Sequence, residues 1–119
     1  MPAAFLEPLR FWPRPRLFGP DDNLRYVQAS SVTPSYFAVV GTRPALGRFF
    51  VESEGVVGGT ARVVVISHDI WQTDFGGDRS IIVKSIAIGS AKYTVVGVAP
   101  RGFTGAYLDR VDLWFPQQM

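Results

Sequence analysis

Ser67, His68 and Asp69 are the three residue types of a hydrolytic triad, in which histidine takes a proton from serine and the carboxylate orients the imidazole. That chemistry needs three side chains that converge on one point. The side chains of direct sequence neighbours diverge on a strand and on a helix, so this tripeptide does not predict a triad. We interpret Ser67 as the cap of a helix and His68 as a residue of its first turn.

A metal site would have to be built largely from carboxylates. His68 is the only histidine and the chain contains no cysteine, which leaves Asp69, Asp74 and Asp78 as the other candidate ligands. Their spacing does not correspond to a known ligand pattern. We therefore predict no metal ion and no thiol chemistry for this chain.

Three further patterns match functional motifs only in part. Glu52 and Glu54 are paired carboxylates of the kind used in acid–base catalysis, but the sequence offers no pocket for them, which favours a solvated loop. Residues 55–59 contain glycines without the spacing of a phosphate-binding loop. Residues 74–76 match the magnesium-binding triplet of protein kinases without the other kinase motifs. We predict that the protein is not an enzyme and has no cofactor and no catalytic, cofactor-binding or metal residue, and the sequence identifies no substrate- or partner-binding residue.

Length and charge narrow the class of protein. The chain has 119 residues, of which 47% are hydrophobic and 18% charged, as expected for one globular domain. Its net charge of +2 is spread along the sequence, and the nearest basic cluster, Arg10, Arg14 and Arg16, is interrupted by proline and aromatic residues. Nucleic-acid binders concentrate such charge, so we predict no nucleic-acid partner. The lack of cysteine leaves the cellular compartment open.

The sequence contains no signal for membrane insertion or export. No apolar run approaches the roughly 20 residues that cross a bilayer. Glu7, Pro8 and Arg10 interrupt the apolar stretch that a signal peptide would need near the N-terminus. The sequence thus predicts neither a transmembrane segment nor a recognisable signal peptide.

Proline density and apolar periodicity divide the chain. Five of the nine prolines fall within residues 1–22, where they oppose helices and central strands, so we predict a disordered Pro/Arg-rich tail followed by a folded domain over residues 23–119. Residues 24–30 alternate in polarity as a strand does. The continuous β-branched run Val63–Ile66 is typical of a strand in the centre of a sheet, covered on both faces.

Two short helices are predicted from their caps. Thr33 supplies a capping hydroxyl and Pro34 a favoured first residue for a helix that ends at Gly41. The second helix follows Ser67 and ends at Gly76.

The C-terminal third of the chain is predicted to be mainly β-structure. Apolar residues between 81 and 98 flank a Gly89-Ser90 turn, which predicts a β-hairpin, and residues 111–115 form a last short strand. The predicted fold class is α+β, with an antiparallel or mixed sheet and two short helices.

Four phrases occur in one order over most of the chain. They are "ALGR" at residues 45–48, "ISH" followed by "FGGD" within residues 64–78, "YTVVGV" followed by Pro and Gly-Phe within residues 93–103, and "DLW" within residues 112–116. By these phrases the chain resembles the MacB-like periplasmic core domain of ABC transporter permeases, in particular the FtsX-like permeases that lack a fused ATPase.

The chain departs from this family at two turns. Family members usually carry a glycine before the strand that opens the hairpin, where this chain has Val83 and Lys84. They often turn with Asn-Gly, where this chain has Gly89 and Ser90. Both departures concern local turn geometry more than the fold.

The resemblance implies a partial MacB-like extracytoplasmic core domain over residues 23–119, in a fragment or a truncated relative. It implies a non-catalytic domain that takes part in efflux or mechanotransmission at the periplasmic face of the bacterial inner membrane. The implied partners are the membrane helices of the intact permease and a separate cytoplasmic ATPase, and a periplasmic partner or self-association is also compatible with it. The alternative is a free-standing soluble binding module of the same fold.

Overall fold

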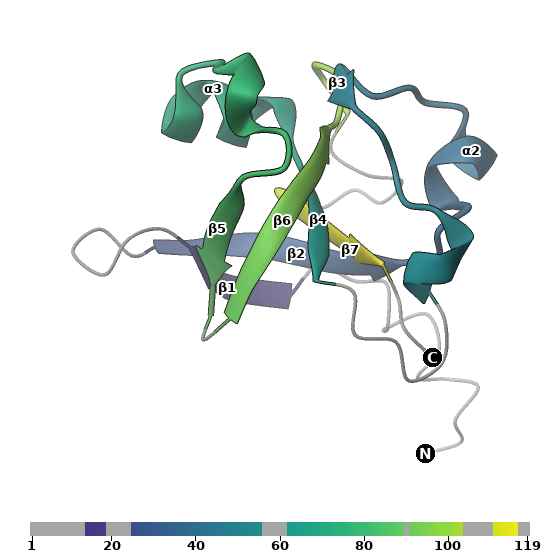
Figure 1. Ribbon diagram of the computed structural model, residues 1–119, viewed down its shortest axis with the longest axis horizontal. Coiled ribbons are helices and arrows are strands. Elements are labelled where there is room, and N and C mark those ends of the chain that lie inside the picture. Colours follow the sequence, from purple (N-terminus) through teal and green to yellow (C-terminus); the bar gives the residue numbers. More distant parts are fainter. Residues whose placement is uncertain (1–13, 19–24, 56–61, 90, 104–110, 117–119) are drawn as a thin grey trace.

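The computed structural model describes residues 14–18, 25–55, 62–89, 91–103 and 111–116. These residues form one mixed sheet in the strand order β3-β6-β4-β7-β2-β1-β5 (Figure 1). The strands are β1 (Arg14–Phe18), β2 (Arg25–Val32), β3 (Leu46–Gly47), β4 (Val63–Ile66), β5 (Ser85–Ile88), β6 (Ala91–Val98) and β7 (Leu113–Pro116). The helices are α2 (Tyr36–Val40), α3 (His68–Phe75) and two short 3₁₀ segments, η2 (Glu52–Gly55) and η3 (Arg79–Ile81). The predicted α+β class is confirmed.

The sheet curls until its ends meet. β5 pairs with β6 along its whole length, and β1 meets β5 where Phe18 lies opposite Ile88. Strands β6, β4, β7, β2, β1 and β5 therefore form a ring, and β3 is attached outside it to β6. The β2–β7 and β4–β6 pairs are parallel and the other pairs are antiparallel, so the sheet is mixed.

Side chains inside the ring make up the first of two cores, which we call the inner core. Its buried residues come from all six ring strands, from α3 and from η3: Phe18, Val27, Ala29, Val64, Ile66, Ile70, Trp71, Ile81, Ile86, Ile88, Val95, Val98 and Leu113. Helix α3 thus packs on the interior of the ring.

The outer core lies on the other face of the same strands. It comprises Val32, Phe37, Phe50, Val65, Val96, Ala99, Val111 and Trp114. Phe37 belongs to α2, so the two helices cover opposite faces of the sheet (Figure 1). Because Val64 and Ile66 face inward while Val65 faces outward, β4 is covered on both faces, and the predicted buried strand is confirmed.

The predicted caps of α3 are confirmed. Ser67 Oγ accepts a hydrogen bond of 3.1 Å from the Ile70 N–H, which satisfies a donor of the first turn. Gly76 ends the helix in the left-handed conformation, at φ +61°.

The predicted start of α2 is wrong, although its end at Gly41 is confirmed. Ser35, not Thr33, is the N-cap residue, and it makes no capping hydrogen bond with its side chain. The Tyr36 N–H donates to Thr33 O at 3.0 Å, so residues 33–36 form a turn before the helix.

The predicted disordered tail over residues 1–22 is wrong for residues 14–18. These residues form β1, which pairs antiparallel with β2, and Pro15 lies opposite Gln28. Proline is tolerated there because, among the described residues, the contacts of the other edge of β1 lie at Leu17 and Phe18, away from Pro15. Residues 1–13 and 19–22 of the predicted tail lie outside the described residues.

Val83 begins a β-bulge where η3 leads into β5. Its N–H donates to Val95 O at 2.8 Å, while the Val95 N–H donates to Lys84 O at 2.9 Å, so two residues lie opposite one. In the G1 type of bulge the first residue takes the left-handed conformation, and Val83 does so with φ +68°. A β-branched residue is strained in this conformation.

Replacing Val83 with glycine is expected to raise the stability of the domain. The valine side chain is 77% exposed, so its removal sacrifices little packing, whereas the left-handed strain of about 1–2 kcal/mol is relieved. Glycine loses more conformational entropy on folding, which offsets part of this relief. We therefore expect the free energy of unfolding, measured by thermal unfolding, to rise by about 1 kcal/mol. Val39→Gly is the matched control, because Val39 is equally exposed but helical, and it should lower the melting temperature. A lower melting temperature for both variants would contradict the strain at Val83.

Candidate functional site

The residues of the apparent triad have separate structural positions at the start of α3. Ser67 is buried and its hydroxyl oxygen accepts the capping bond from Ile70. The His68 ring lies edge-on to Trp71, with ring centroids 5.4 Å apart. Asp69 is exposed in the first turn, where its charge complements the positive end of the helix dipole.

The other candidate metal ligands, Asp74 and Asp78, are exposed at the end of α3 and just after it. Asp78 Oδ1 accepts hydrogen bonds from the Ser80 N–H (2.9 Å) and the Ser80 hydroxyl (2.8 Å), and these bonds lower the pKa of the carboxyl group. Lys84 Nζ lies 3.6 Å from Asp78 Oδ2. Asp74 Oδ2 lies 3.4 Å from the hydroxyl of its neighbour Thr73. In the part of the chain that the structure describes, no three His, Asp or Glu side chains are grouped so that they could hold a metal ion.

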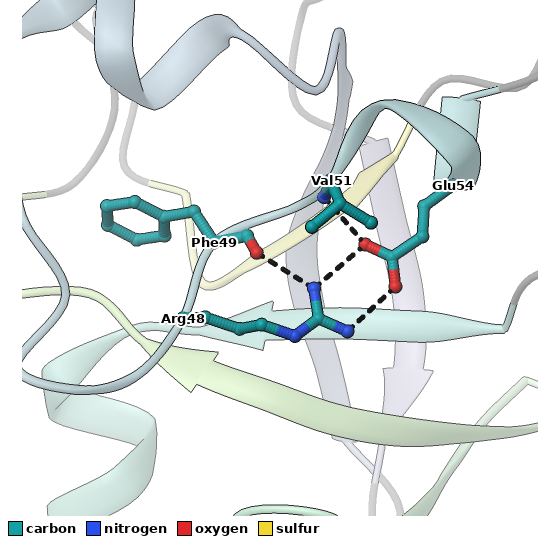
Figure 2. Close-up of polar contacts among 4 residues, drawn as sticks. All are labelled: Arg48, Phe49, Val51 and Glu54. Atoms are coloured by element: carbon teal, nitrogen blue, oxygen red, sulfur yellow. Dashed lines mark hydrogen bonds and ion pairs between the residues drawn. The ribbon is translucent and has the colours of Figure 1, made fainter.

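A second polar cluster joins Arg48, which follows β3, to Glu54 of η2 (Figure 2). Arg48 Nη1 donates to Glu54 Oε1 at 3.0 Å, and Nη2 donates to Oε2 at 2.9 Å. The Val51 N–H also donates to Glu54 Oε1 (2.9 Å), and Arg48 Nη1 donates to Phe49 O (3.0 Å). The Glu54 side chain is only 11% exposed, so the prediction of a solvated carboxylate at this position is wrong.

This Arg48–Glu54 clamp fixes the loop between β3 and η2, in which Phe50 is buried in the outer core and Phe49 packs against that core. The Phe49 ring stacks on Phe37 of α2 with centroids 3.9 Å apart, and Phe50 lies 6.0 Å from the same ring. Because the clamp bonds the backbone of Phe49 and Val51, it holds these rings against α2. Its arrangement is that of a structural brace, with both carboxylate oxygens already occupied by bonds within the loop.

Arg48 is positioned by a close approach of β3 to β6. The Arg48 N–H donates to Val96 O at 2.9 Å, and the Ala45 N–H donates to Val98 O at 2.8 Å. A Cβ atom on Gly47 would lie 2.3 Å from Val96 O, which leaves room only for glycine. The sequence phrase "ALGR" therefore contains β3, which packs against β6 and places Arg48 beside Glu54.

Asp112 is a second buried carboxylate with a structural role. The Gln28 N–H donates to Asp112 Oδ2 at 3.0 Å, and the Asp112 N–H donates to Gln28 O at 2.8 Å. The Ser67 N–H donates to Asp112 O at 2.8 Å. Asp112 thus ties the end of β4 to β2 just before β7 begins, which accounts for the first residue of the "DLW" phrase.

Protonation of Glu54 should weaken the fold in acid. The hydrogen bonds from Arg48 are the main cause that lowers the Glu54 pKa below its ordinary value of 4.5. The contribution of the clamp is complete above the unfolded pKa of about 4.5 and is lost as the pH falls through the lower folded pKa. Glu54→Gln should cost about 2 kcal/mol at neutral pH, and the difference from the unaltered protein should shrink below about pH 4.5.

Denaturant unfolding as a function of pH measures this difference. The single variant Arg48→Met and the double variant Arg48→Met/Glu54→Gln serve as controls. The double variant should lose less stability than the sum of the losses of the two single variants. A loss from Glu54→Gln that is equal at every pH would contradict the assigned role of the carboxylate.

Residues 8–119 match the family model of the MacB-like periplasmic core domain. The chain belongs to this family. MacB-like periplasmic core domains are parts of ABC transporter permeases and are not a class of enzymes. The match confirms the resemblance found in the sequence. No curated protein matches the chain.

Solved structures of this fold give the scale of the similarity. The periplasmic region of MacB from Actinobacillus actinomycetemcomitans aligns with a TM-score of 0.70 and 17% identity, over 90% of this chain and 46% of that one. The extracellular domain of the noncanonic ABC-type transporter YknZ from Gram-positive bacteria aligns with a TM-score of 0.69 and 18% identity, over 90% of this chain and 52% of that one.

A domain of a putative permease protein from Porphyromonas gingivalis aligns with a TM-score of 0.56 and 16% identity, over 87% of this chain and 48% of that one. The chain thus spans about half the length of the structures it matches. None of the helices in the described part of the chain combines the length and the apolar character needed to cross a bilayer.

Arg48, Glu54 and Asp112 belong to no catalytic motif. The Arg48–Glu54 clamp and Asp112 organise loops and strand junctions, and the sequence signalled two of the three residues only as parts of the phrases "ALGR" and "DLW". A carboxylate six residues after the arginine was the available signal for the clamp.

Proposed function

We propose that this chain is the extracytoplasmic core domain of an ABC transporter permease and passes motion between the membrane and the periplasm during efflux or mechanotransmission. The observation that carries the proposal is the family match over residues 8–119, together with a fold shared with the MacB periplasmic region. The proposed partners are the membrane helices of the permease and a separate cytoplasmic ATPase. The domain itself performs no catalysis in this proposal.

The directions of the strands support attachment of the domain to one membrane surface through the segments before β1 and after β7. Arg14, the first residue of β1, pairs with Ala29, and Pro116, the last residue of β7, pairs with Val32. Since β1 runs antiparallel to β2 and β7 parallel to it, the chain enters β1 and leaves β7 at the same end of β2. Segments that flank these two strands could both be fixed to one membrane face.

Cell fractionation tests the location. An antibody raised against this chain should detect the native protein in the membrane fraction of its host, and protease added outside spheroplasts should digest the detected domain. Recovery in the soluble fraction would overturn the proposal and favour a free-standing binding module.

A fluorescent label on the domain tests whether it moves with ATP hydrolysis. The chain contains no cysteine, so Val39→Cys, at an exposed position of α2, introduces a single thiol into it. In the intact permease reconstituted with its ATPase, the label should change its emission when ATP is added. The same preparation without the ATPase is the control. No response at Val39 or at a second exposed position, Val83→Cys, would contradict the mechanical role.

A further inference from the structure

The end of the domain at which β4 and β6 begin carries two exposed basic residues, Arg62 and Lys92, which we call the basic pair. Arg62 directly precedes β4, and its carbonyl oxygen accepts a hydrogen bond of 2.8 Å from the Thr94 N–H of β6. Lys92 is the residue after Ala91, at which β6 begins. Because β4 and β6 are parallel, both basic residues lie where their strands begin. The basic pair therefore marks one end of the sheet.

Two aromatic side chains lie at the same end. Phe115 is close to the end of β7, which runs antiparallel to β4 and therefore ends where β4 begins. Its ring centroid lies 4.9 Å from that of Tyr93, the residue after Lys92. Both rings are partly buried and pack against the inner core. Aromatic rings beside Lys and Arg are a combination typical of surfaces that meet the headgroup layer of a bilayer.

The other end of the sheet carries a balanced set of charges. Helix α3 follows the last residue of β4, so it lies at the opposite end from Arg62 (Figure 1). Asp69 and Asp74 are exposed on α3. Two exposed basic residues accompany them, Arg79 in η3 after the helix and Arg101 after the end of β6. An anionic surface would therefore attract the end with the basic pair more strongly than the end with α3.

We propose that the end with the basic pair contacts the bilayer, and that Arg62 and Lys92 bind the phosphate groups of anionic lipid headgroups. The inference rests on the proposed function in one respect, because a membrane attachment after β7 would turn this end toward the lipid. Phe115 directly precedes Pro116, the last residue of β7, so the same attachment would bring the rings of Phe115 and Tyr93 to the level of the headgroups.

The size of the effect indicates what the contact does. Each Lys or Arg close to an anionic membrane raises the binding constant about five-fold. Two such residues hold a free domain on a membrane only weakly, but they suffice to orient a domain that is already tethered. The basic pair thus determines which way the domain faces.

Binding of the full chain to lipid vesicles at low ionic strength, measured by co-sedimentation, tests the contact. Vesicles of phosphatidylglycerol are anionic, whereas vesicles of phosphatidylcholine have no net charge and serve as the lipid control. The partition coefficient should be at least about 10-fold higher for phosphatidylglycerol, and added salt should remove the difference.

Two charge-reversed variants separate the basic pair from the net charge of the chain. Arg62→Glu/Lys92→Glu should lower the partition coefficient on phosphatidylglycerol at least about 10-fold. Arg79→Glu/Arg101→Glu changes the net charge by the same amount at the α3 end and should lower the coefficient by no more than about three-fold. The four side chains are exposed, so both variants should fold, and thermal unfolding verifies this. Arg62→Gln/Lys92→Gln replaces the first variant if it does not fold, with the same expected direction.

Equal losses in the two charge-reversed variants would overturn the lipid contact, because binding would then depend on net charge alone. Equal binding to both lipids, or no binding of the unaltered chain to phosphatidylglycerol, would also overturn it. Each of these results would leave the proposed permease domain standing, since membrane fractionation tests that proposal independently. Recovery of the native protein in the soluble fraction would overturn the permease proposal and, with it, the orientation of the domain on a membrane.

Discussion

Replacing Gly97 with alanine is expected to be among the most damaging single changes in this domain. A Cβ atom at residue 97 would lie 1.9 Å from Arg48 O and 2.9 Å from Arg48 C, and both are backbone atoms that cannot rotate away. Relief requires β3 to move off β6, which breaks the bonds from Arg48 to Val96 and from Ala45 to Val98. We expect a loss on the order of 4 kcal/mol or more in the free energy of unfolding, measured by denaturant titration.

Gly89→Ala is the matched control for this substitution. Gly89 also lies in the sheet region, at φ +62°, but a Cβ atom there would meet no other atom within 4 Å. Its cost should be limited to the conformational strain of about 1–2 kcal/mol. If Gly97→Ala costs no more than Gly89→Ala, the close contact between β3 and β6 is not present in solution.

Trp71→Ala should cost about 3–5 kcal/mol, which is a large part of the 5–15 kcal/mol that stabilises a typical domain. Trp71 is 8% exposed in the inner core and, with Ile70, is one of the two buried residues of α3. Its indole Nε1–H also donates to Asp78 O at 2.9 Å, which ties the end of α3 to the turn that follows. The variant loses both the packing and this bond.

Trp71→Phe distinguishes the two contributions. Phenylalanine retains most of the ring but cannot donate to Asp78, so its cost should be about 1–2 kcal/mol, clearly below that of alanine. The thermal unfolding of both variants measures this difference. An unchanged melting temperature for Trp71→Ala would show that α3 does not pack on the inner core as described.

Local signals in the sequence determined the elements whose ends are set by near neighbours. Ser67 and Gly76 bound α3 because a cap forms between residues three positions apart and because glycine adopts a left-handed conformation at little cost. The β-branched run Val63–Ile66 identified a buried strand, and the Gly89-Ser90 turn identified the β5–β6 hairpin. The family phrases then identified the domain, and the family match over residues 8–119 confirms that identification.

The features that the sequence missed depend on partners far along the chain. The prolines near Arg14–Phe18 opposed a strand locally, but pairing with β2 along one edge outweighs that preference. Glu54 looked solvated because nothing in its own segment showed that Arg48 and the Val51 amide would enclose it. Thr33 has a side chain that favours the N-cap position, but its carbonyl group closes a turn over residues 33–36, so the helix begins only at Tyr36.

The sequence by itself determined that this chain is an α+β domain of the MacB-like family with a buried central strand and a capped helix on the sheet. Only the tertiary structure decided that the sheet closes into a ring at Phe18 and Ile88 and that Gly97 must lack a side chain where Arg48 crosses it. The physical reason is the separation along the sequence between the residues that interact. Caps, turns and apolar periodicity act within a few residues, whereas closure and close approach depend on backbone positions that the chain brings together only when the whole sheet has formed.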